Sequence, residues 1–258
     1  MYHRRWQTVL LLFLLVPGAA RAQAVRNNTL RADSIPDVGW RPIAIGAAVL
    51  GATLLVDSPI ANVFESPGSA ASARAANTFD KFGEITGIGV VIGGLGLASL
   101  ATHDHRVVEA TIRTAASVAV ATGITEALKY AVGRQRPYLD PDRDALDFHL
   151  FKGTPSGSPS FPSGHTTTAF ALATSLGDAI DKDWARVVLF GLAAGTGWAR
   201  MQQQQHWVTD VVAGAAVGIV SAKFANGHLR LLGVRAPRIL LSSRDAGVRW
   251  TIPLPAVR

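Results

Sequence analysis

The 258-residue sequence contains no cysteine, only two methionines, and few charged side chains, which make up 17% of the chain. Without cysteine the chain can form neither a disulfide nor a zinc site with thiolate ligands. Cysteine usage therefore does not indicate whether the protein lies in a reducing or an oxidising compartment. Lysine and arginine form no dense block and do not alternate with aromatic residues, which argues against nucleic acid as a partner. The net charge is nevertheless +7, and this surplus fits an anionic substrate or lipid head groups.

Hydrophobic residues make up 48% of the chain and gather in uncharged runs bounded by charged residues. These runs are rich in Ala, Leu, Val and Ile without strict alternation, which favours helix over strand, and their frequent small residues allow close helix packing. An amphipathic segment follows the first run, at Ala70–Phe82. The sequence therefore predicts an all-α fold, an up-down helical bundle of about six core helices. The six runs are Pro42–Val56, Ile85–Thr102, Thr114–Thr125, Thr166–Gly177, Val187–Ala199 and Val211–Ala222.

The two ends of the chain differ in character from this body. Residues 1–22 have the layout of a secretory signal peptide, with a basic start, a short apolar run and Ala20-Arg21-Ala22 before a cleavage point. We therefore expect an exported protein whose helical domain covers residues 23–230. In the tail, residues 231–258, two short segments (Ile239–Ser243 and Val248–Ile252) flank a glycine turn and predict a β-hairpin.

Three polar clusters stand at the ends of the predicted helices. The first ends the third helix, the second opens the fourth, and the third joins the end of the fifth to the start of the sixth. In an up-down bundle all four of these places fall at the same end. Eight residues are therefore predicted to converge on a site there: Lys129, Arg136, Ser163, Gly164, His165, Arg200, His206 and Asp210.

The residue types in these clusters suit phosphate chemistry. Asp210 follows His206 by one helical turn, so its carboxylate can fix the tautomer of the ring and leave the other nitrogen as a nucleophile. Arg200 supplies a planar cation that can hold phosphate oxygens in pairs. A helix that starts at Ser163 presents free N–H groups to an anion, and Gly164 lets the anion approach the backbone closely.

In order and spacing, Lys-x6-Arg-Pro, Pro-Ser-Gly-His and Arg-x5-His-x3-Asp resemble the signature of the type 2 phosphatidic acid phosphatase and vanadium haloperoxidase superfamily. The resemblance implies that His206 attacks phosphorus and forms a phosphohistidine while Asp210 orients its ring. It implies that His165 protonates the leaving alkoxide and later activates water. It also implies that neither a metal nor another cofactor is needed, because the phosphoryl oxygens are held by the protein. The oxygen-binding residues are Lys129, Arg136, Ser163, Gly164 and Arg200.

One position departs from the family pattern, which has Ser where this chain has Ala199. Loss of that hydroxyl removes at most one supporting hydrogen bond, worth about 1 kcal/mol. Elsewhere, His103-Asp104-His105 is interpreted as an exposed turn rather than a metal site, because no third ligand can be named. The acidic stretch between the first two motifs lacks the glycine and the final Glu of a calcium loop and is interpreted as a solvated loop.

The resemblance leaves several functions open. The chain is expected to be a metal-independent phosphatase acting on phosphate mono- or diesters of lipids or small molecules, of the phosphatidate, phosphatidylglycerol phosphate, polyprenyl diphosphate or lipid A type. Vanadate is then an expected inhibitor, because it mimics the transition state. The alternatives are a haloperoxidase that holds vanadate as cofactor, and a non-catalytic envelope protein that binds anions.

Membrane topology is also open. We expect a periplasmic location or an inner-membrane bundle whose site faces the periplasm, with a slight preference for the periplasmic or membrane-associated bundle because most apolar runs are short. If the signal is cleaved and the first three apolar segments all cross, Lys129 would lie in the cytoplasm. Membrane association is expected, and the sequence does not indicate an oligomeric state.

Overall fold

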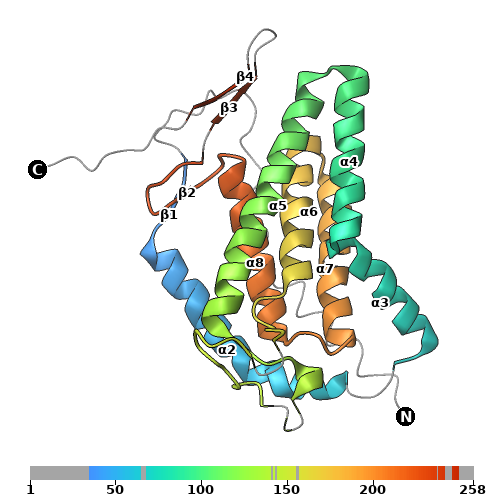
Figure 1. The fold of residues 1–258 in the computed structure, drawn as a ribbon, viewed down its shortest axis with the longest axis vertical. Helices are drawn as coiled ribbons and strands as arrows, with labels where there is room; N and C mark the ends of the chain where they lie inside the picture. The colour runs from blue at the N-terminus through green and yellow to red at the C-terminus, as the bar shows by residue number, and fades with distance from the viewer. Residues whose placement is uncertain are drawn as a thin grey trace, which may run out of the picture. The chain divides into compact units, whose positions relative to one another are not determined.

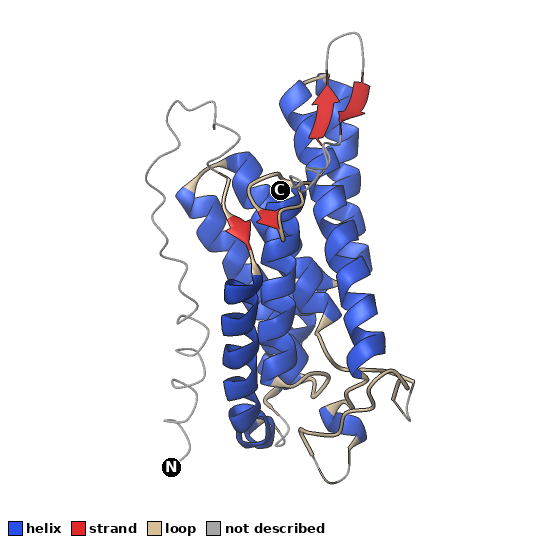
Figure 2. Cartoon of the chain, turned by 90° about the vertical axis from the view of Figure 1, so that its left-hand side faces the viewer, coloured by secondary structure: helices blue, strands red, loops and turns tan. Residues whose placement is uncertain are grey.

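The structure is a computed structural model and describes residues 35–64, 68–140, 142, 144–154, 157–236, 238–241 and 246–249. These residues form a bundle of α-helices with short strands at its margin (Figures 1 and 2), which confirms the predicted all-α class with an added hairpin. The predicted signal peptide, residues 1–22, lies outside the described residues. The helices are α2 (Trp40–Val63), α3 (Ala70–Gly83), α4 (Ile85–Thr102), α5 (His105–Val132), α6 (Gly164–Ile180), α7 (Asp183–Gln202) and α8 (Val208–Ala225).

Helix α6 lies at the centre of the bundle and packs against α5, α7 and α8. Its residues are buried almost without interruption from Thr166 to Gly177. The approach of α8 to α6 depends on small residues, because a Cβ added to Gly218 would lie 2.9 Å from the backbone nitrogen of Ala171. The expectation that small residues allow close helix packing is thus confirmed at this contact.

Several helices are longer than their uncharged runs. The run Thr114–Thr125 becomes the 28-residue helix α5, because the charged residues at both ends of the run continue its helix. The first run was predicted to end at Val56, but α2 continues through Asp57 and Pro59 to Val63. Asp57 is fully buried and ion-paired, and this pairing allows a carboxylate inside an otherwise apolar helix.

Four of the described helices are long and apolar enough to cross a membrane: α2, α4, α5 and α8. Only 6% of the apolar window is buried in α2 and in α4, and large side chains stand outward on both, such as Leu55 at 80% exposure and Ile85 at 79%. An apolar helix that is exposed over most of its surface is suited to lipid rather than to water. This pattern favours a membrane-embedded bundle over the periplasmic one that the short runs suggested.

Two small strand pairs lie at the margin of the bundle (Figure 2). β1 (Asp37–Val38) pairs in parallel with β2 (Arg230–Leu231), which places the start of α2 beside the end of α8. β3 (Arg238–Leu241) and β4 (Ala246–Arg249) form the predicted antiparallel hairpin. Gly247 pairs with Leu240 inside this ladder, so both strands begin and end earlier in the chain than predicted, and the glycine lies in a strand rather than in the turn.

Candidate active site

The three polar clusters meet at the end of the bundle where α5 and α7 finish and α6 and α8 begin (Figure 1). A Cβ on Gly164 would lie 3.4 Å from Lys129 Nζ, so the first cluster touches the second. The backbone N–H of Ser163 donates to the Asp210 carbonyl at 3.0 Å, which joins the second cluster to the third. The convergence predicted from the alternation of the helices therefore exists in the structure.

His206 is buried just before α8, with its Nδ1 3.6 Å from Asp210 Oδ2. This separation is too long for a hydrogen bond, and Oδ2 instead accepts the Trp207 N–H at 2.9 Å. Catalytic hydrogen bonds are often long in a free enzyme and shorten when substrate binds. Because Nδ1 faces the carboxylate, Nε2 is the nitrogen that can attack a substrate.

The surroundings of His206 keep its ring neutral. Burial lowers the pKa of His206 to about 4, against the opposing effect of Asp210 and with a further lowering by Arg200 and Arg136. A neutral imidazole has a free lone pair, so His206 can act as a nucleophile at neutral pH without first losing a proton.

His165 is in the first turn of α6. Burial lowers the pKa of His165 as well; Arg200 and Lys129 lower it further, while Asp80 and Glu84 oppose them. Arg200 therefore lies close enough to both imidazoles to lower the pKa of each.

Each predicted cation is held by polar groups of the protein. Arg200 donates from one terminal nitrogen to both carboxylate oxygens of Asp80, at 3.2 and 3.0 Å, and to Gln203 Oε1 at 2.8 Å. Its Nε is buried and has no hydrogen-bond partner among the described residues. Lys129 Nζ pairs with Glu126 at 2.8 Å.

Arg136 and the helix start complete the predicted set. Arg136 donates through Nε to the Ser158 carbonyl at 3.2 Å and through Nη1 to the side chain of Gln205. The Ser163 hydroxyl pairs with the Thr166 hydroxyl at 2.8 Å rather than capping the helix. Gly164 is the first helical residue, and the N–H groups of a first turn have no intrahelical partner and remain available to an anion.

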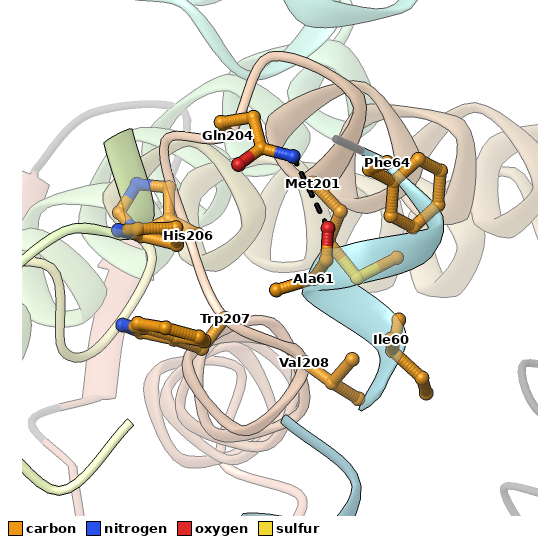
Figure 3. A pocket seen from close by; sticks show the side chains of 9 residues that line it. Ile60, Ala61, Phe64, Met201, Gln204, His206, Trp207 and Val208 are labelled. Carbon is orange, nitrogen blue, oxygen red and sulfur yellow. Dashed lines mark hydrogen bonds between the residues drawn. The ribbon is translucent and has the colours of Figure 1, made fainter. Parts of the chain in front are cut away.

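A small, mostly apolar recess adjoins His206. Figure 3 shows His206 and Trp207 on one side of it and the α2 residues Ile60 and Phe64 on the other. Gln204 closes part of the rim, where its Nε2 donates to the Ala61 carbonyl at 3.2 Å. The end of α2 thus forms one wall of the site.

Three charged residues at the site were not predicted from the sequence. Arg134 and Asp57 are fully buried behind Asp210, and Asp80 of α3 pairs with Arg200. A signal for Asp57 was present, because it is an acidic residue among apolar ones, and such a residue needs a buried partner. For Asp80 no signal existed, since a charged residue on an amphipathic helix is ordinarily solvated.

The fold and the site together define a class of protein: a helical bundle with two histidines and several cationic side chains gathered at one end. Residues 110–228, which contain all three motifs, match the PAP2 superfamily. The resemblance inferred from the motifs is thereby confirmed.

Curated relatives match part of the chain. A lipid A 1-phosphatase of Porphyromonas gingivalis is 37% identical over 111 residues, which cover 42% of this chain and 21% of the relative. A lipid A 1-phosphatase of Rhizobium johnstonii is 36% identical over 91 residues, which cover 35% of this chain and 36% of the relative. A lipid A 4'-phosphatase of Bacteroides thetaiotaomicron is 32% identical over 109 residues, covering 39% and 48%. The matches thus span between about a fifth and a half of these relatives.

Two solved structures share the fold. Aquifex aeolicus LpxE aligns with a TM-score of 0.51 at 21% identity, over 66% of this chain and 94% of the other. A PAP2 type phosphatidylglycerolphosphate phosphatase from Bacillus subtilis aligns with a TM-score of 0.52 at 18% identity, over 73% and 92%. At these identities the likeness supports the helical architecture, and the chemistry rests on the site itself.

Proposed function

We propose that this protein is a metal-independent lipid phosphatase that works through a phosphohistidine. The observation that carries the proposal is a buried His206 whose ring is neutral, which lies beside Asp210 and is influenced electrostatically by Arg200, at the end of the bundle that also holds His165 and Lys129. Phosphatase names among the curated relatives support the same activity.

In the first step, His206 Nε2 attacks phosphorus and the bond from phosphorus to the ester oxygen breaks. The leaving oxygen takes a proton from His165 and departs as an alcohol. The negative charge of a bound phosphate beside His165 raises the pKa of His165 and so opposes the effect of Arg200. Substrate binding itself therefore favours the protonated form of His165. Asp210 stabilises the positive charge that develops on the His206 ring.

In the second step, water attacks the phosphohistidine and His165 takes one of its protons. The bond from phosphorus to nitrogen breaks, inorganic phosphate leaves, and His206 returns to its neutral form. The phosphoryl oxygens stay in contact with Arg200, Arg136 and Lys129 throughout, and these three cations supply the charge that a metal would otherwise provide. The unpartnered Nε of Arg200 is one donor available to them.

A lipid substrate is supported by the surface around the site. Large apolar side chains of the segment that joins α5 to α6 are exposed there, including Tyr138 at 50% and Phe151 at 67%. Aromatic side chains of this kind suit the interface between membrane and water. Because the curated relatives are named lipid A phosphatases, the phosphate groups of lipid A are the first substrates to test. We place the site at the outer face of the inner membrane.

The proposal is tested by measuring phosphate release from lipid A, phosphatidate, phosphatidylglycerol phosphate, a polyprenyl diphosphate and a soluble aryl phosphate. The wild type is compared with His206→Ala and with the matched control His105→Ala, which removes an exposed imidazole at the far end of α5. We expect release from at least one lipid by the wild type and the control, and none above background by His206→Ala.

Other outcomes separate the alternative functions. Equal release by the wild type and His206→Ala contradicts the nucleophile assignment. Binding of phosphate without turnover of any ester favours a non-catalytic anion-binding protein. Oxidation of bromide after vanadate and peroxide are added favours a haloperoxidase.

A further inference from the structure

Behind the nucleophile, Asp57, Arg134 and Asp210 form a row of charged side chains that are all fully buried. Arg134 donates from one terminal nitrogen to Asp210 Oδ1 at 2.8 Å and from the other to Asp57 Oδ2 at 2.6 Å. The second oxygen of Asp57 accepts the Thr209 N–H at 2.8 Å. The row therefore links α2, the motif between α5 and α6, and the first turn of α8.

The contacts of Arg134 leave its guanidinium no freedom to turn. Its Nε and Nη2 both donate to the Ala145 carbonyl, at 3.0 and 2.6 Å. Its carbon Cζ lies 5.2 Å from the ring centre of Phe148 and 5.1 Å from that of Trp207. A planar cation fixed in this way holds a carboxylate with one orientation, which an ammonium group cannot do.

The consequence for catalysis concerns the two oxygens of Asp210. Arg134 occupies Oδ1, so Oδ2, which also accepts the Trp207 N–H, is the oxygen on the side of His206 Nδ1. With both carboxylates ionised, the two carboxylates and one guanidinium give the row a formal net charge of −1. That charge lies where the His206 ring becomes positive during the reaction.

We infer that Arg134 and Asp57 are positioning residues for the nucleophile, which fix the orientation of Asp210 and maintain one negative charge behind the His206 ring. The inference rests on the proposed phosphatase function. A purely structural ion pair would hold α2 against α8 and have no bearing on the protonation of His206, and buried pairs of that kind are common enough to require a direct test.

The test uses two single variants that change the charge of the row in opposite directions and a double variant that restores it. Asp57→Asn makes the row neutral, Arg134→Gln makes it −2, and the double variant restores −1 with two amides. The acid limb of kcat/KM against pH reports the protonation of an essential base in the free enzyme. The other charged groups that act on His206, Arg200 and Arg136, are unchanged in all three.

We expect the acid limb to move to lower pH in Asp57→Asn, which removes a negative charge near the ring. In Arg134→Gln it should move to higher pH, because a positive charge is removed. Each shift should be about half a pH unit or more. The double variant should return close to the wild-type limb. All three should lose about 10-fold or more in kcat with a smaller change in KM, since Asp210 is less well oriented. Asp178→Asn, which removes the carboxylate that pairs with Lys223 and His228 at the other end of the bundle, should leave the acid limb in place.

Shifts of the same sign in the two single variants, or no shift in either, would overturn the inference. If Arg134→Gln does not fold, Arg134→Lys replaces it, because it keeps the charge. That variant should leave the limb in place and lower kcat, whereas Asp57→Asn still moves the limb. Failure of the proposed function is seen separately, as equal activity of the wild type and His206→Ala.

Discussion

Gly83, the last residue of α3, packs without a side chain against the start of α6. A Cβ at this position would lie 2.9 Å from the carbonyl carbon of His165, closer still to its oxygen, and 2.7 Å from Thr196 Cγ2. Since comfortable contacts between such atoms begin near 3.5 Å, the Gly83→Ala variant must separate the two backbones by about 1 Å. The change also threatens the bond from the Thr168 hydroxyl to the Gly83 carbonyl, at 2.7 Å.

A displacement of about 1 Å in a catalytic group can cost on the order of 100-fold in rate. We therefore expect Gly83→Ala to lower kcat by about that factor and to lower the free energy of unfolding by about 1–3 kcal/mol through overpacking. The assay is phosphate release in detergent at saturating lipid, with thermal unfolding measured in parallel. The matched control is Gly89→Ala in α4, where a Cβ meets nothing within 4 Å. A Gly83→Ala enzyme with wild-type kcat would refute the claim that this contact sets the position of His165.

Three further predictions concern protonation, inhibition and stability. The pKa of His206 is lowered to about 4, and only the neutral ring attacks. As the pH falls through 6.5, kcat/KM should therefore stay constant, and it should decrease only near pH 4. A pH profile with an acid limb at 6.5 would contradict this. Vanadate should inhibit in competition with substrate, and Arg200→Ala should weaken that inhibition by about 10-fold or more, as measured by dose–response curves; undiminished inhibition would argue against the role of Arg200. Asp178 accepts hydrogen bonds from Lys223, Asn226 and His228. Asp178→Asn should therefore lower the free energy of unfolding by about 1–3 kcal/mol without changing kcat. A loss of kcat in folded protein would contradict the view that Asp178 lies outside the site.

The arrangement of the site was predictable because its residues occur at helix ends. A helix that begins close to a histidine turns back within four residues and brings a carboxylate there near the ring, and alternating helices must bring alternate ends together. His206 itself precedes α8 by two residues, whereas it was expected to open the helix. These two rules placed His206 with Asp210 and brought Lys129 near Gly164, and the structure agrees. Neither rule needs the identity of the core residues.

The partners of the site residues could not be predicted in the same way. Asp80 and Asp57 reach the site from α3 and α2, more than 70 residues before the residues that they contact. Such contacts depend on how helices pack, which charge patterns along the chain do not encode. The end of α2 was predicted too early for a related reason. Asp57 interrupts the apolar run in the sequence, but in the structure its charge is balanced by Arg134, so the helix continues past it.

The path of the chain through the bundle makes the side of the membrane testable. The start of α2 lies beside the end of α8 through the pairing of β1 with β2, whereas the end of α2 lines the recess at His206. Helix α5, with 28 residues, is about 42 Å long and exceeds the apolar thickness of a bilayer. If α2, α4 and α5 all cross, a site at the outer face requires the start of α2 to be cytoplasmic, which disagrees with a cleaved export signal.

The absence of natural cysteine allows this conflict to be resolved with single introduced thiols. We place Asp142→Cys at the site end and His105→Cys at the α4–α5 turn, both at exposed positions, and treat intact spheroplasts with a membrane-impermeant maleimide. Labelling of Asp142→Cys alone is the result expected for a site at the outer face. Labelling of His105→Cys alone would place the site in the cytoplasm, as a cleaved signal followed by three crossings requires. Labelling of both would show that the bundle does not span the membrane, because one reagent that cannot cross lipid would then have reached both of its ends.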